Sequence, residues 1–183
     1  MTSMFSVTFS TANSPIPSSK GNIVLIKTPV DSDVPRLIEL AIRVFEPFYE
    51  GYVHPLLGEE VFRHQHGDWR GDYRRDIPTL RDPDHGRFMA LAETDDAVAG
   101  FISWNIGIKY RHGEIYLLAV SPEYRRMDVA HELCLHAMRS MKLSGVDVVE
   151  IGTGGDPFHA AARELYESLG FTKIPLAAYL KRI

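Results

Sequence analysis

The stretch from Glu114 to Leu133, EIYLLAVSPEYRRMDVAHEL, most constrains what this 183-residue chain can fold into. It begins with apolar residues that favour β-structure, breaks at Ser121-Pro122 and crosses a polar turn. Beyond the turn, apolar residues recur at three-and-four spacing up to Met141, the pattern of an amphipathic helix packed on a sheet. The pattern predicts a strand, a tight turn and a helix in direct succession.

The turn between that strand and helix has the features of an anion site. The first turn of a helix presents unpaired backbone N–H groups and a partial positive charge. Arg125 and Arg126 add two full positive charges. A strand-to-helix turn with two solvated arginines has the same composition, so these residues alone leave both interpretations open.

Two motifs in the chain resemble those of a known family. Val120 to Ala130, VSPEYRRMDVA, resembles the acetyl-CoA motif of the GNAT superfamily of N-acetyltransferases. Ala162 to Phe171, ARELYESLGF, resembles the second common signature of that family. The motifs stand in the family's order, and the resemblance covers roughly residues 87–183. The strand and helix patterns from Ile23 to Phe45 agree with the family's N-terminal half.

The resemblance implies an α+β (α/β) fold, the GNAT fold. Its mixed, mostly antiparallel central sheet has about six or seven strands flanked by helices. Acetyl-CoA is expected in the cleft between the motif strand and the following parallel strand. The residue patterns predict strands at Ile23–Lys27, Phe88–Glu93, Ala99–Ile106, Glu114–Val120, Val146–Ile151 and Ala177–Arg182.

The residue patterns also predict helices in both halves of the chain. A first helix is expected after Asp31–Asp33, with Pro47 ending it, and a second around Gly58–Arg75. A last helix is expected over His159–Phe171, closed by Gly170.

The sequence predicts a leader followed by one domain. Residues 1–20 are rich in Ser and Thr and are expected to form a flexible leader, with a short strand at Phe5–Phe9 as the alternative. Residues 21–183 are expected to form a single GNAT acyltransferase domain.

The resemblance also implies which residues bind acetyl-CoA, the expected co-substrate. In the family, backbone amides of the motif turn hold the pyrophosphate, and backbone N–H groups of the motif strand bind pantetheine. His159 stands where the second signature often has asparagine. The expected cofactor-binding residues are Leu118, Ala119, Val120, Arg125, Arg126, Met127, Asp128, Val129, Ala130, His159 and Ala162.

Asp128 departs from the motif, which has glycine at this position. An aspartate adds a side chain and a negative charge beside the anion. It tolerates the left-handed region better than most residues, and it is a good helix N-cap. Asp128 is therefore expected either to cap the helix or to weaken cofactor binding.

Acetyl transfer to an amine requires a base for the amine and a proton for the leaving thiolate. In the resemblance, the glutamate at the position of Glu114 often acts as general base and the tyrosine at Tyr166 protonates the thiolate. Strict alternation would place Glu114, Tyr116 and Leu118 on one face. The alternatives are a solvated carboxylate for Glu114, with His112 as rival base, and a packing role for Tyr166.

Three functions remain open from the sequence. The favoured one is an N-acetyltransferase that moves the acetyl group to a primary amine of a small molecule by direct attack in a ternary complex. Carboxylates and aromatic residues in the variable region suit a cationic amine; the carboxylates are Glu46, Glu50, Glu59 and Glu60. The alternatives are a protein or peptide N-acetyltransferase and a non-catalytic GNAT-fold binding domain with an impaired CoA site.

The composition of the chain limits the kinds of partner that are expected. The net charge of −4 and the absence of a basic block argue against nucleic acid. No apolar run approaches the about 18 residues that span a membrane, and no signal peptide is evident, so a cytoplasmic location is expected. The single cysteine, Cys134, is expected in the core, and His54, His64 and His66 lack ligand spacing, so no metal is expected. The family resemblance makes a homodimer reasonable.

Overall fold

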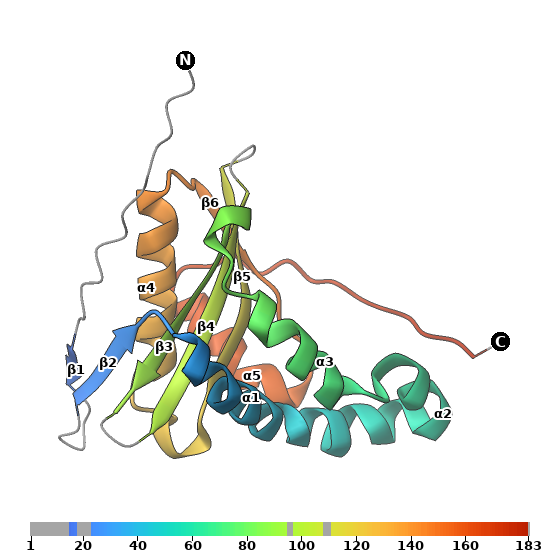
Figure 1. The fold of residues 1–183 in the computed structure, drawn as a ribbon. Coiled ribbons are helices and arrows are strands. Elements are labelled where there is room, and N and C mark those ends of the chain that lie inside the picture. Colours follow the sequence, from blue (N-terminus) through green and yellow to red (C-terminus); the bar gives the residue numbers. More distant parts are fainter. Residues whose placement is uncertain (1–14, 18–22, 95–96, 108–110, 183) are drawn as a thin grey trace.

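A mixed sheet with the strand order β1-β2-β3-β4-β5-β6 forms the centre of the fold (Figure 1). The computed structural model describes residues 15–17, 23–94, 97–107 and 111–182. All neighbouring strands are antiparallel except β5 and β6, which are parallel. The strands are β1 (Pro15–Pro17), β2 (Ile23–Lys27), β3 (Arg87–Glu93), β4 (Val98–Gly107), β5 (His112–Val120) and β6 (Val148–Ile151).

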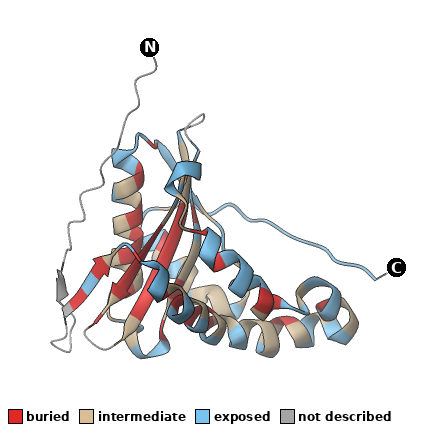
Figure 2. Cartoon of the chain, viewed as in Figure 1, coloured by how far each residue is buried: buried red, intermediate tan, exposed pale blue. Residues whose placement is uncertain are grey.

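Helices cover both faces of this sheet. One cluster of buried side chains joins α4 to the sheet, with Ala90 and Ile102 among the strand residues. A second cluster joins α1 to the other face through Leu91 and Phe101. Figure 2 shows the buried residues gathered in the central strands and on the helix faces turned toward them. The helices are α1 (Val34–Phe48), α2 (His54–His66), α3 (Trp69–Asp76), α4 (Val129–Leu143) and α5 (Ala160–Ser168).

These features confirm the expected mixed, mostly antiparallel sheet with flanking helices. The order strand, turn and helix around residues 114–133 appears as β5, a short turn and α4. Gly145, after α4, and Gly170, after α5, take φ values of +84° and +88°, the left-handed region that glycine adopts without steric cost.

Strand β5 carries a β-bulge at Tyr116. Trp104 of β4 lies opposite Ile115, whereas the neighbouring Ser103 lies opposite Leu117. Tyr116 is therefore an extra residue with no partner opposite it in β4. Such a residue shifts the alternation of side chains between the two faces of a sheet.

The bulge corrects the predicted face of Leu118. Ile115 packs in the cluster on the α4 side, but Leu117 packs on the α1 side and Leu118 again on the α4 side. Glu114 and Tyr116 thus share the α1 side, and Leu118 lies on the opposite face. The prediction that all three share one face is wrong for Leu118, because it assumed strict alternation.

Pro47 does not end the first helix, contrary to the expectation from the sequence. Helix α1 extends to Phe48 and continues through a π-helical turn, Tyr49–Val53, into α2. In this turn the His54 N–H bonds to the carbonyl of Tyr49, five residues earlier. A proline lacks an N–H and crowds the preceding turn, and one wider turn accommodates that disturbance without ending the helical path.

The predicted second helix is two helices. α2 ends at His66 and α3 begins at Trp69, and Gly58 within α2 has a φ of +74°. In the predicted leader, β1 pairs with β2, so residues 15–17 form a strand. The alternative strand at Phe5–Phe9 lies outside the described residues.

The expected last strand, Ala177–Arg182, is absent. Residues 171–182 have no regular structure and extend away from the sheet toward α2 (Figure 1). Arg182 forms an ion pair with Glu60 at 2.8 Å. A strand needs a partner for its backbone groups, and along this path no strand lies beside the segment. No helix in the described part of the chain is long and apolar enough to cross a membrane.

Candidate acetyl-CoA and acceptor site

A cavity opens where β5 and β6 separate. The two strands pair only from His112 to Ile115 and from Val148 to Ile151. Strand β5 continues to Val120, whereas the chain leaves β6 into a glycine-containing loop. A cavity of about 830 Å³ occupies the opening, walled by β5, the turn before α4, α1 and α5.

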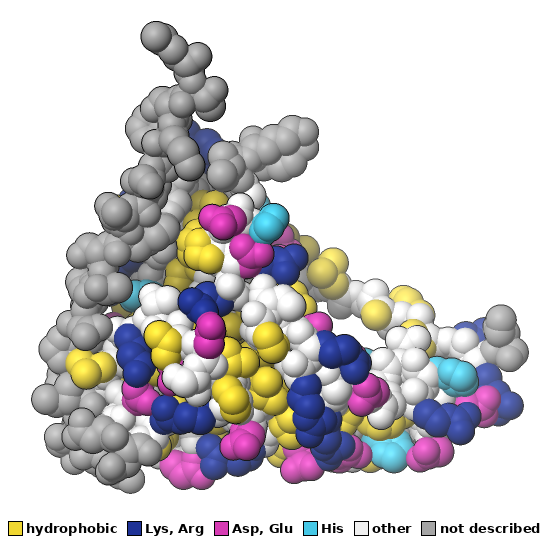
Figure 3. Space-filling view, in the orientation of Figure 1, with side chains coloured by type: hydrophobic (Ala, Val, Ile, Leu, Met, Phe, Trp, Pro, Cys, Tyr) yellow, Lys and Arg dark blue, Asp and Glu magenta, His cyan; other side chains and the backbone are white. Residues whose placement is uncertain are grey.

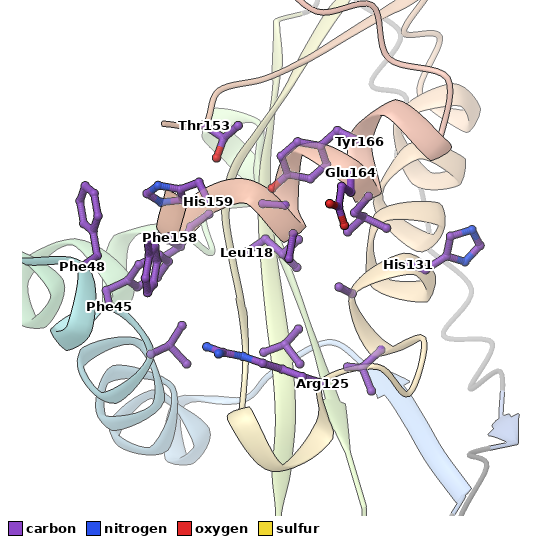
Figure 4. A pocket seen from close by; sticks show the side chains of 18 of the residues that line it. Phe45, Phe48, Leu118, Arg125, His131, Thr153, Phe158, His159, Glu164 and Tyr166 are labelled. Atoms are coloured by element: carbon purple, nitrogen blue, oxygen red, sulfur yellow. The ribbon is translucent and has the colours of Figure 1, made fainter. Parts of the chain in front are cut away.

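The turn before α4 lies at one end of this cavity. Arg126 and Asp128 have φ values of +59° and +58°, so the backbone takes the left-handed conformation twice before α4 begins at Val129. Arg125 and Arg126 are exposed and line the cavity, and neither forms an ion pair with any described residue. Figure 4 shows Arg125 extending across that end of the cavity. Two unpaired guanidinium groups beside a helix start fit a pyrophosphate.

Most of the predicted cofactor residues lie together in this cavity. Ala119 does not line it, because its side chain is buried on the α1 side of the sheet. Met127 packs against the core cluster beneath α4 instead. The cofactor contacts predicted for these two residues stay predictions. The predicted residues that line the cavity are Leu118, Val120, Arg125, Arg126, Asp128, Val129, Ala130, His159 and Ala162.

The other end of the cavity is aromatic. Phe45 stacks on Tyr73 with ring centres 5.5 Å apart, and Phe48 lies 5.5 Å from Phe158. Figure 4 shows Phe45, Phe48 and Phe158 gathered at this end, away from the α4 side. A second cavity of about 400 Å³ adjoins it and shares Tyr49, Tyr73, Tyr116 and Leu117 with the first. The sequence predicted a crowd of aromatic residues in this region but not how they pack.

Tyr166 faces the cavity from α5 and is only 9% exposed. Burial, and to a lesser extent the nearby Cys134, raises the pKa of the Tyr166 phenol above its ordinary value. A phenol with a raised pKa stays protonated at neutral pH. Tyr166 can therefore present a proton to an atom in the cavity.

Comparison with known proteins gives the family. Residues 44–171 match the model of the acetyltransferase (GNAT) family. The chain belongs to the GNAT family. Both expected motifs lie within the matched residues, and acetyl-CoA is the co-substrate of this family.

Individual relatives of this GNAT chain differ in their acceptors. A mycothiol acetyltransferase from Nocardiopsis dassonvillei is 34% identical over 106 residues, which cover 54% of this chain and 31% of that protein. The chain thus spans about a third of the length of this curated relative.

Solved structures share the fold at lower identity. The aminoglycoside N-acetyltransferase AAC(6')-Iy in complex with CoA has a TM-score of 0.64 at 15% identity, covering 90% of this chain and 97% of that one. The ribosomal-protein-S18-alanine N-acetyltransferase from Escherichia coli has a TM-score of 0.60 at 16% identity, covering 83% and 79%. One of these names specifies a small-molecule acceptor and the other a protein, so the likeness shows the fold and leaves the acceptor open.

Asp128 occupies the glycine position of the GNAT motif without acting as a side-chain cap. It is the residue before α4, but its carboxylate accepts no capping hydrogen bond. Its side chain is exposed and lines the cavity beside the two arginines. The structure therefore shows no side-chain cap at Asp128, and weakened cofactor binding stays a prediction.

Replacing Asp128 by glycine is expected to tighten acetyl-CoA binding by up to about tenfold, equivalent to about 1.4 kcal/mol. Glycine takes the left-handed conformation without steric cost and removes the negative charge. Calorimetric titration measures the dissociation constant. Asp128→Asn removes only the charge and should give most of the gain, and an unchanged dissociation constant in both variants would show that Asp128 does not face the cofactor.

Glu114 lies outside the cavity. At Glu114, β5 is paired on both sides, with Asn105 of β4 and Glu150 of β6, so the sheet is closed at this level. The Glu114 carboxylate accepts a hydrogen bond from Asn105 Nδ2 at 3.4 Å. His112, the rival base, lies further back and pairs with Glu150 at 3.4 Å. The assignment of Glu114 as base stays a prediction, and it requires a water path into the cavity.

Cys134 is buried in the core under α4, as the sequence predicted. Burial raises the pKa of its thiol to about 12, so the reactive thiolate is scarce at neutral pH. Cys134 does not line the cavity.

Cys134→Ala is therefore expected to keep kcat within about twofold, because the thiol carries no acyl group. A steady-state assay that showed loss of turnover in a folded variant would instead indicate an acyl-enzyme.

The carboxylates expected to attract a cationic amine are already paired. Arg70 binds Glu46 at 2.5 Å and Glu50 at 2.8 Å, His54 binds Glu59 at 2.8 Å, and Arg182 binds Glu60. None of the four carboxylates lines either cavity. Figure 3 shows acidic and basic side chains interspersed over α1 to α3.

Two other carboxylates, Asp72 and Asp76 of α3, line the second cavity. Asp72 pairs with Arg75 at 2.5 Å, whereas Asp76 has no ion pair among the described residues. Both residues occur in the polar segment RGDYRRD, whose alternating charges gave no signal that distinguished them from solvated residues.

Proposed function

We propose that this chain transfers the acetyl group of acetyl-CoA to a primary amine of a small molecule, by direct attack in a ternary complex. The proposal is carried by one continuous cavity with an anion-binding turn at one end and aromatic side chains at the other. Direct transfer requires both substrates in one enclosure, so that the amine and the thioester meet in a fixed geometry.

In this proposal the turn and β5 hold acetyl-CoA. Arg125, Arg126 and the first N–H groups of α4 bind the pyrophosphate. Beyond Ile115, strand β5 has no partner strand on its β6 side among the described residues. Backbone groups of Leu118 and Val120 on that edge are therefore available to the amides of pantetheine and to the thioester carbonyl.

The amine enters from the aromatic end. Tyr49, Tyr73 and Tyr116 line the second cavity, where an aromatic ring can attract a cationic group. Asp76, which forms no ion pair with any described residue, supplies a carboxylate in the same wall. The volume of about 400 Å³ is within the usual range for small-molecule sites, which supports a small acceptor over a protein segment.

Tyr166 is assigned as the proton donor. When the nitrogen attacks the thioester carbonyl carbon and the C–S bond breaks, the thiolate must gain a proton to become a stable leaving group. Tyr166 faces the cavity with its phenol held neutral by burial, which suits this role. The buried Cys134 gives no route to an acyl-enzyme, which supports direct transfer.

An amine panel tests this proposal. The full chain is incubated with acetyl-CoA and, separately, with polyamines, amino sugars, aminoglycosides and peptides with free N-termini, and CoA release and product mass are followed. Acetylation of small amines alone is expected. Acetylation of peptides alone would indicate a protein acceptor, and acetyl-CoA binding without any transfer would indicate a non-catalytic domain.

The cytoplasmic location and a homodimer stay predictions.

A further inference from the structure

An aspartate–histidine pair lies in the cavity wall at the start of α5. Asp156 Oδ2 lies 2.7 Å from His159 Nδ1, and the His159 backbone N–H donates to Asp156 Oδ1 at 3.2 Å. The two side chains are only 8% and 17% exposed. We propose that His159 is the general base that deprotonates the acceptor amine and that Asp156 is its positioning residue. This inference rests on the acetyl transfer proposed above.

The hydrogen bond to Asp156 defines the tautomer of the neutral imidazole. Although burial of the carboxyl opposes it, hydrogen bonding from His159 holds the pKa of Asp156 below its ordinary value, so this residue is an ionised acceptor. An ionised carboxylate takes the proton on Nδ1, which leaves the lone pair of a neutral imidazole on Nε2. Nε2 has no hydrogen-bond partner among the described residues, and His159 lines the cavity.

The surroundings of His159 place its imidazole at the aromatic end of the cavity. Phe48 and Phe158 approach the imidazole edge-on, with ring centres 4.7 and 4.9 Å away. Figure 4 shows His159 beside Phe158 and Thr153, with Tyr166 further along α5. Tyr166 follows His159 by seven positions, which is about 10 Å along a helix axis. In this proposal the base lies at the aromatic end, where the amine binds, and the proton donor lies further along α5.

Few charged groups surround the imidazole. On its own segment these are Asp156 and Arg163, whose guanidinium donates to the backbone carbonyls of Gly154 at 2.6 Å and Asp156 at 2.7 Å. Glu164 and Tyr166 line the cavity further along α5. From α1, the residue in ring contact is the uncharged Phe48. Arg163 thus stabilises the loop that carries Asp156.

Gly154 is required for this arrangement. A Cβ atom at residue 154 would lie 2.0 Å from Asp156 Oδ2 and 2.7 Å from His159 Nδ1, closer than real contacts allow. The backbone therefore packs directly against the hydrogen-bonded pair. This contact gives a structural reason for one glycine of the loop Gly152–Asp156.

The proposed reaction releases one proton to solvent through His159 and returns Tyr166 to its protonated state. His159 Nε2 takes one proton from the ammonium form of the acceptor, and the freed nitrogen lone pair attacks the carbonyl carbon. As the C–S bond breaks, the Tyr166 hydroxyl gives its proton to the thiolate sulfur, and Tyr166 regains a proton from the new amide nitrogen. The proton on His159 leaves to solvent, so the products are the amide, CoA and one proton.

The test is the pH profile of kcat at saturating acetyl-CoA and amine, using the best acceptor from the panel. Wild type should lose activity as the pH falls through the range of about 5 to 8 in which histidine titrates. His159→Asn retains a hydrogen-bonding group, so the dissociation constant of acetyl-CoA should hold, while kcat at neutral pH falls by about 100-fold and the acid limb is lost. Asp156→Asn should lower kcat less than His159→Asn does. It should also shift the pH at which kcat falls.

A matched control is available on the surface. Asp82 and His85 form a pair with the same spacing and the same 2.7 Å distance, but their side chains are 41% and 76% exposed and lie outside both cavities. His85→Asn should leave the pH profile unchanged. In His159→Ala, added imidazole should restore part of the lost kcat, an effect that a structural role would not produce.

The outcomes separate the two proposals. If wild type acetylates no amine, the proposed function fails and the assignment of His159 fails with it. If wild type transfers acetyl and His159→Asn keeps the acid limb, only the assignment fails. A raised KM for acetyl-CoA with an unchanged limb would show that His159 is a cofactor contact, and loss of the limb in Glu114→Gln alone would return the role of base to Glu114.

Discussion

Replacing Tyr166 by phenylalanine is expected to lower kcat by about 100-fold with little change in the dissociation constant of acetyl-CoA. The substitution keeps the buried ring and removes only the hydroxyl that would protonate the thiolate. Steady-state kinetics and calorimetric titration separate the two constants. Because burial raises the pKa of Tyr166, the wild-type phenol stays protonated, and its ionisation should cause no loss of kcat below about pH 10.

Tyr179 provides the control for this substitution. It lies in the C-terminal segment, is 92% exposed and lines neither cavity. Tyr179→Phe should leave kcat unchanged. If Tyr166→Phe keeps full turnover, Tyr166 is a packing residue and the proton comes from elsewhere. If the whole loss lies in acetyl-CoA affinity, the hydroxyl is a binding group.

Replacing Arg125 and Arg126 together by glutamine is expected to weaken acetyl-CoA binding about 10- to 100-fold. Neither guanidinium has an ion-pair partner in the described part of the chain, so both are available to the phosphates. The effect should shrink at high salt, because exposed charges are screened. Calorimetric titration at two salt concentrations measures both effects.

A ligand without phosphates isolates the contribution of these arginines. Acetyl-pantetheine retains the thioester and the amides but lacks the pyrophosphate, so the double substitution should not alter its binding. Arg139→Gln is the matched control, because Arg139 is exposed on α4 and does not line the cavity. Equal loss for both ligands would indicate a disrupted turn, and no loss for acetyl-CoA would place its phosphates elsewhere.

The centre of the fold was predictable from the sequence because its signals are local. The run before Ser121 and the spacing after Asp128 each specify one element, and glycines at 145 and 170 mark the helix ends. The face of the sheet on which each side chain lies was harder to predict from the sequence. The bulge at Tyr116 depends on pairing with β4, so strict alternation placed Leu118 on the wrong face.

Contacts between distant residues explain the other differences. Arg70 neutralises Glu46 and Glu50 from 24 and 20 residues away, a pairing that composition does not reveal. The C-terminal segment has the composition of a strand but no neighbouring strand along its path. In each case the sequence identified the residue type, and three-dimensional packing decided what it contacts.

One part of the site had a sequence signal that was missed. Asp156-Pro157 is the pattern of a helix N-cap followed by proline, and the residue three positions after such an aspartate is the one its side chain reaches. That residue is His159. The family resemblance implied a cofactor contact for His159, whereas the local pattern predicts its hydrogen bond with Asp156.

Binding of acetyl-CoA at the turn from Ser121 to Ala130 is tested most directly by calorimetric titration of the full chain, compared with the Arg125→Gln, Arg126→Gln variant. Micromolar binding at one site per chain, strongly weakened in the variant, is the predicted result. No detectable binding, or equal affinity in both proteins, would contradict the assignment of this turn to the cofactor.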